Sequence, residues 1–101
     1  MNQDLTETDE GRQRAVIEEI IERTRPGVEF CWASEGITET HILKIKGPGY
    51  RIRLRISQDS LEATDDPANI PQLEQEVERQ WKISESGGVG YVKFPARALT
   101  A

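Results

Sequence analysis

The first hydrophobic residues of the chain recur with the spacing of an amphipathic helix over residues 9–24. Its apolar stripe consists of Val16, Ile17, Ile20 and Ile21. Charged side chains occupy most of the remaining circumference, which is the pattern of a helix with one buried face. Asp9 and Glu10 complement the positive end of the helix dipole, and the Pro-Gly pair at 26–27 ends the helix.

Three segments that follow alternate between apolar and polar residues with the period of a β-strand. The strand patterns are "VEFCWA" at 28–33, "ETHILKIK" at 39–46 and "YRIRLRIS" at 50–57. The links between them are short and contain glycine, which is typical of hairpins. The pattern therefore predicts an antiparallel meander whose third strand presents a row of arginines on one face.

The two links predict a register for this meander. With Gly36 first in a two-residue loop, Trp32 faces His41. With a four-residue loop at 46–49, His41 faces Leu54. The two registers agree on which residues share a face, and a slip of one residue would invert a whole strand. One face carries Val28, Phe30, Trp32, Leu43, Ile45, Tyr50, Ile52 and Leu54, and the other carries Glu29, Cys31, Ile42, Lys44, Arg51, Arg53 and Arg55.

The second half of the chain begins with the acidic segment 58–70, for which we predict a loop with room for a helical turn over 59–63. A second helix is predicted over 71–82 because apolar residues recur there at helical spacing. These residues are Leu73, Val77 and Trp81.

A final strand is predicted in "VGYVKFP", after a glycine-rich link. We expect Val92 and Phe94 to face the core, and Tyr91 and Lys93 to lie on the opposite side of the strand. The sequence leaves open whether this strand pairs with the first or the third strand of the meander.

The predicted fold is a single α+β domain of 101 residues with the order α-β-β-β-α-β. Two helices are expected to cover the apolar face of an antiparallel sheet, while the other face is exposed to solvent. A chain of this length has room for one hydrophobic core. Residues 1–7 are expected to be flexible.

The formal net charge of −5 argues against a general nucleic-acid binder, which usually carries excess positive charge. The single cysteine, Cys31, cannot form an internal disulfide, so the sequence shows no sign of secretion. No apolar segment is long enough to span a bilayer, and the acidic N-terminus does not resemble a signal peptide. We therefore expect a cytoplasmic protein that does not bind membranes.

The polar residues do not form a catalytic or metal-binding pattern. Cys31 and His41 are predicted on opposite faces of the sheet, so they do not form a thiol–imidazole pair. One histidine and one cysteine are too few for a tetrahedral metal site. The acidic segment 58–70 lacks the glycine and terminal glutamate of a calcium loop. The sequence thus predicts a protein that is not an enzyme and has no cofactor or metal.

The arginine row is the strongest functional signal, because guanidinium groups pair with carboxylates and phosphates. We predict a non-catalytic binding module that docks an acidic protein partner. The alternatives are single-stranded nucleic acid, with Tyr91 stacking on a base, and a solvated face without a ligand. Self-association of the chain into a homo-oligomer through the same face is a further alternative, although it would bring arginines against arginines unless the two faces were offset onto Glu29 and Glu39. The predicted binding residues are Arg51, Arg53, Arg55, Lys44, Ile42, Tyr91 and Lys93.

Overall fold

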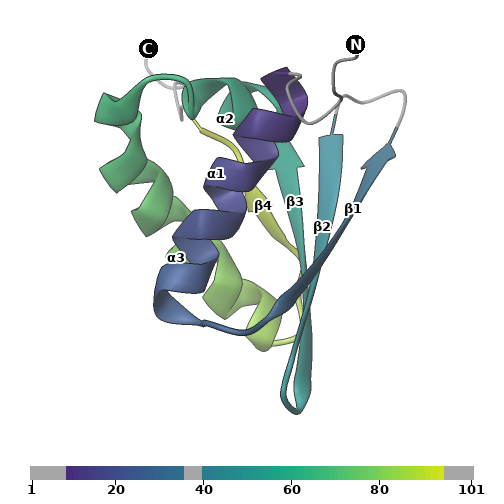
Figure 1. Ribbon diagram of the computed structural model, residues 1–101. Helices are drawn as coiled ribbons and strands as arrows, with labels where there is room; N and C mark the ends of the chain where they lie inside the picture. The colour runs from purple at the N-terminus through teal and green to yellow at the C-terminus, as the bar shows by residue number, and fades with distance from the viewer. Residues whose placement is uncertain (1–8, 36–39, 95–101) are drawn as a thin grey trace, which may run out of the picture.

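The computed structural model describes residues 9–35 and 40–94, which form a four-stranded sheet and a layer of helices (Figure 1). The elements are α1 (Asp9–Thr24), β1 (Glu29–Glu35), β2 (Thr40–Gly47), β3 (Tyr50–Ser57), α2 (Gln58–Ala63), a 3₁₀ turn (Pro67–Asn69), α3 (Ile70–Glu85) and β4 (Gly90–Val92). The predicted single α+β domain is confirmed at this level. The expectation for residues 1–7 lies outside the described residues.

The sheet is mixed, so the prediction of a purely antiparallel sheet is wrong. Its strand order is β1-β2-β3-β4, with β1, β2 and β3 antiparallel and β4 parallel to β3. The segment 58–89, which contains α2 and α3, connects β3 to β4 as a crossover. Such a connection returns the chain to the end of the sheet where β3 began, and a strand that starts there runs parallel to β3.

Both predicted hairpin registers are wrong by two residues. Trp32 lies opposite Leu43, and Leu43 lies opposite Leu54. The first link spans 36–39, outside the described residues, and the second is the tight turn at Pro48 and Gly49. Gly49 has a φ of +83°, a conformation that glycine adopts without steric cost. Because side chains alternate with a period of two, a shift of two residues leaves every side chain on its predicted face.

The hydrophobic core lies between the helices and one face of the sheet (Figure 1). Its fully buried members come from α1, β2, β3, α2, α3 and β4: Ile17, Ile21, Leu43, Ile45, Leu54, Ile56, Leu61, Leu73, Val77, Trp81 and Val92. Tyr50 lies at the margin of this core. Its side chain is 36 % exposed, and its ring meets the Trp81 ring edge-on at a centroid distance of 6.0 Å.

The helical turn predicted within the acidic segment is present as α2, and the rest of 58–70 is more regular than the predicted loop. Ser57 caps α2 by accepting a hydrogen bond from the backbone N–H of Ser60 at 3.1 Å. Asp66 caps the following 3₁₀ turn through the N–H of Ala68. α3 then begins at Ile70 and continues to Glu85, a longer helix than the predicted 71–82.

The last strand is held by side chains of α2 and α3 as well as by β3. The buried Ser60 hydroxyl lies 3.0 Å from the carbonyl oxygen of Val92 and accepts a hydrogen bond from the N–H of Phe94 at 2.7 Å. From α3, Ser84 Oγ and Gln80 Oε1 accept the N–H groups of Gly90 and Tyr91, each at 3.0 Å. β4 is therefore anchored between the helix layer and the sheet.

Candidate binding face of the sheet

Four basic side chains form a two-by-two array on the sheet face opposite the core. Lys44 of β2 lies opposite Arg53 of β3, and Lys46 lies opposite Arg51. Side chains directly opposite each other in an antiparallel pair have Cβ atoms about 5 Å apart, and neighbours along a strand on one face are about 7 Å apart. We refer to Lys44, Lys46, Arg51 and Arg53 as the cationic array. All four residues are exposed.

None of these four side chains forms an ion pair within residues 9–35 and 40–94. Glu29, the nearest carboxylate by register, lies opposite Lys46 at the margin of the array. The acidic segment does not fold back onto it, because Asp65 binds Arg12 and the buried Gln13 of α1, each at 3.0 Å. These hydrogen bonds, from Arg12 first and then Gln13, lower the pKa of Asp65.

The array borders a shallow hollow of about 510 Å³, which Glu29, Phe30 and Cys31 also line. Cys31 lies opposite Lys44, and its small, exposed side chain leaves the space above β1 open. The hollow is therefore bounded by four cations and one carboxylate, a local charge opposite in sign to the net charge of −5.

The remaining predicted binding residues form a second group near β4. Arg55 pairs in register with Ile42 on one side and Tyr91 on the other. The Arg55 guanidinium carbon lies 5.6 Å from the Tyr91 ring centroid, and the Lys93 ammonium lies 5.2 Å from it. The Tyr91 hydroxyl is also 3.3 Å from the Thr40 hydroxyl across the sheet. Arg55 and Tyr91 are half-buried, so contacts within this group already use part of their side-chain surface.

All seven predicted residues thus share one face, in two groups of different character. Lys46 was missed by the sequence reasoning because the predicted loop at 46–49 included it. The alternation of β2 continues through Lys46 and could have identified it.

His41 does not form a catalytic pair with Cys31. The imidazole is buried on the core side, whereas Cys31 is exposed on the other face. Its Nε2 lies 2.8 Å from Gln58 Oε1, and its Nδ1 lies 3.0 Å from Arg14 Nη2 and 3.5 Å from a carboxylate oxygen of Glu10. Because both ring nitrogens contact protein groups, the imidazole is part of a structural network that connects α1, β2 and α2.

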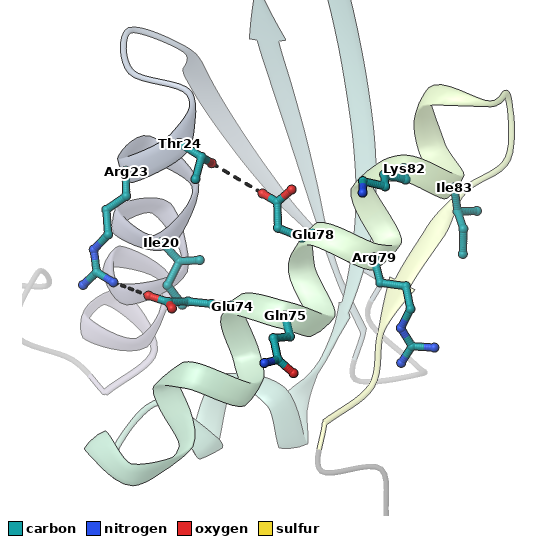
Figure 2. Close-up of a pocket in the computed structure, with 9 residues that line it drawn as sticks. All are labelled: Ile20, Arg23, Thr24, Glu74, Gln75, Glu78, Arg79, Lys82 and Ile83. Carbon is teal, nitrogen blue, oxygen red and sulfur yellow. Dashed lines mark hydrogen bonds and ion pairs between the residues drawn. The ribbon is translucent and has the colours of Figure 1, made fainter.

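A second hollow, of about 900 Å³, lies between α1 and α3 (Figure 2). Figure 2 shows Glu74 and Glu78 directed from α3 toward Arg23 and Thr24 at the end of α1. Glu74 forms an ion pair with Arg23, and Glu78 forms one with Arg25. Hydrogen bonding to Arg25 lowers the pKa of Glu78. These carboxylates therefore stabilise the contact between the two helices.

The part of the chain that the structure describes contains no cluster of three or more His, Cys, Asp or Glu residues that could hold a metal ion. Its helices are all too short or too polar to cross a membrane. Comparison with known proteins gives no match to a family model, a curated protein or a solved structure.

Proposed function

We propose that the protein is a small, non-catalytic binding module that docks an acidic segment of a partner protein on the cationic array. The observation that carries this proposal is the set of four neighbouring cations with no ion-pair partner among the described residues. Like charges directly opposite each other in a sheet are destabilising. A bound anionic segment would remove that repulsion, so the array is suited to a ligand.

The distribution of charge supports an encounter with an acidic partner. The net charge of −5 arises mainly from the helices and the acidic segment, whereas the array is positive. A protein with separated charges orients in the field of its partner and associates faster than an unpolarised one. We place this encounter in the cytoplasm on the composition of the chain. Self-association through the array is disfavoured because it would bring like charges together.

A protein partner is favoured over nucleic acid by the aromatic residues. Single-strand binding sites combine cations with several exposed aromatic rings. Of the two Trp, two Tyr and two Phe residues, all described by the structure, only Tyr91 lies on the array's side of the sheet. Its ring contacts Arg55 and Lys93, and its hydroxyl contacts Thr40.

The test uses two labelled probes, oligoglutamate and oligothymidylate of equal charge, titrated with the full chain at low and moderate salt. The site variant is Lys44→Gln/Arg51→Gln/Arg53→Gln. The matched control, Arg12→Gln/Arg79→Gln/Lys82→Gln, removes the same charge from exposed positions on α1 and α3.

The proposal predicts that oligoglutamate binds the wild type and the control variant and fails to bind the site variant. Tighter binding of oligothymidylate with the same variant sensitivity would instead indicate nucleic acid. Equal loss in both variants would show that only overall charge matters, and no binding of either probe at low salt would refute a docking face.

A further inference from the structure

The two edges of the sheet differ in how their backbone groups are satisfied. β1 forms one edge and pairs only with β2. In an antiparallel pair, half of the residues of an edge strand direct their N–H and C=O groups away from the partner strand. Within the described ranges, no group outside β2 hydrogen bonds to the backbone of β1. β1 is thus an open edge of seven residues.

The opposite edge is not open in this way. β4 contains three residues, and the N–H groups of Gly90 and Tyr91 are accepted by Ser84 and Gln80 of α3. Figure 1 shows α3 beside β4, whereas none of the helices in the described ranges lies outside β1. A segment that adds to this sheet therefore finds free backbone groups only at β1 among the described strands.

The centre of β1, residues 30–34, lacks the features with which proteins block an exposed edge. Charged side chains, proline and bulges are the usual devices. The strand "EFCWASE" contains no lysine, arginine, proline or glycine, and its two charged residues, Glu29 and Glu35, stand at its ends. Cys31 and Ala33 present small side chains on the array's side, and Phe30 and Trp32 are half-buried on the other. The centre of the edge is apolar and uncharged, as in strands that pair with a further strand.

We propose that the acidic partner segment binds in extended conformation as an additional strand along β1. This inference rests on the proposed function. Lys44 lies directly behind Cys31, so its long side chain can reach over the small thiol to a carboxylate on the added strand. Residues on the other face of the added strand would contact the exposed parts of Phe30 and Trp32.

The partner is therefore a segment in which acidic and apolar residues alternate, because alternate side chains of a strand point to opposite faces. A second copy of this chain fits less well. Within 30–34 its β1 carries no acidic residue, so a second copy would bring carboxylates only from the ends of the strand, Glu29 and Glu35. Charge complementarity thus selects the acidic segment as the occupant.

The test compares three labelled peptides of equal charge with the full chain. The first alternates Glu and Val over eleven residues, the second contains the same residues in blocks, and the third is the alternating peptide N-methylated at its central residues. Binding is measured by fluorescence anisotropy, and backbone amide exchange is followed in β1 and β4.

We expect the alternating peptide to bind most tightly and to slow amide exchange in residues 29–35 but not in 90–92. N-methylation removes the backbone donors while keeping the charge. Since each hydrogen bond contributes modestly, loss of several should weaken binding by about tenfold or more.

Two results would overturn strand addition while leaving the docking face intact. One is equal binding of the alternating and N-methylated peptides, combined with loss of binding in Lys44→Gln/Arg51→Gln/Arg53→Gln. The other is protection of 29–35 that grows with protein concentration alone, which would identify a second copy as the occupant. If no peptide binds, the proposed function fails together with this inference.

Discussion

Replacing Arg53 by Gln should stabilise the protein, although the substitution removes a charged residue from the centre of the sheet. Arg53 lies opposite Lys44 and two residues from Arg51 and Arg55 on the same strand. It has no ion-pair partner among the described residues. Its removal therefore relieves repulsion without breaking an attractive pair.

The expected magnitude follows from the spacing of these charges. Two unit charges about 6 Å apart in water repel by roughly 0.7 kcal/mol. Screening at moderate ionic strength reduces each such term to about half. Three close neighbours thus destabilise the fold by roughly 1 kcal/mol, and loss of contacts from the arginine stem offsets part of the gain. We expect the free energy of unfolding to rise by about 0.5–1 kcal/mol at moderate ionic strength, and by more at low salt.

Urea unfolding monitored by tryptophan fluorescence measures this change, because Trp81 is buried in the core. The gain should shrink in 0.5 M salt, where screening reduces each repulsion to roughly a quarter of its unscreened value. Arg79→Gln is the control, since Arg79 pairs with Glu76 on the surface of α3 and its loss should lower stability by a few tenths of a kcal/mol at most. Destabilisation by Arg53→Gln at low salt would refute the reasoning and show that the array is stabilised within the fold.

Three further predictions concern the contacts that hold the elements together. In Gly90→Ala, the new methyl group would clash with the backbone carbonyl of Gln80. Urea unfolding should therefore show a loss of about 1–3 kcal/mol in the free energy of unfolding, and an unchanged midpoint would contradict this. Ser60→Ala leaves the N–H of Phe94 without its acceptor and should lower the free energy of unfolding by about 1–3 kcal/mol. Amide exchange should accelerate more in residues 90–94 than in β2, and a uniform acceleration would argue against a local role of Ser60. Arg25 lowers the pKa of Glu78 in the folded state. The pair therefore stabilises the protein at pH values above 4.5, the ordinary pKa of a glutamate, and this stabilisation is lost as the pH falls through the lowered pKa. Thermal melts should therefore show that Arg25→Gln lowers the melting temperature more at pH 7 than at pH 3. The lost stacking on Trp81 should lower it by a similar amount at both pH values. A decrease in melting temperature that does not change with pH would count against a role for the Arg25–Glu78 pair.

The assignment of residues to faces could be predicted because it depends only on a period of two. The register could not, since it depends on loop lengths. Pro48 and Gly49 form a tighter turn than the expected loop at 46–49, and the same error hid Lys46. The faces remained correct because both shifts were of an even number of residues.

The direction in which β4 runs relative to β3 could not be predicted from the sequence. Its pairing covers three residues, and a parallel partner is specified by the crossover rather than by its own side chains. α2 was predicted only as an optional helical turn within a loop, because attention to the acidic composition of 58–70 left Ser57 unrecognised as a helix cap. The candidate site was predicted as a set of residues, but its division into a cationic array and an engaged Arg55–Tyr91 group depends on side-chain geometry.

The crossover that makes β4 parallel also suggests an order of folding. β1, β2 and β3 are joined by short links, so their pairing involves residues near one another in the chain and has a small loop-closure cost. β4 can dock only after the segment 58–89 has folded across the sheet. We therefore expect the meander to pair before the last strand docks, and a transient release of β4 would leave the meander paired. Because the array lies on β2 and β3 and the free edge on β1, both surfaces would persist when β4 is released.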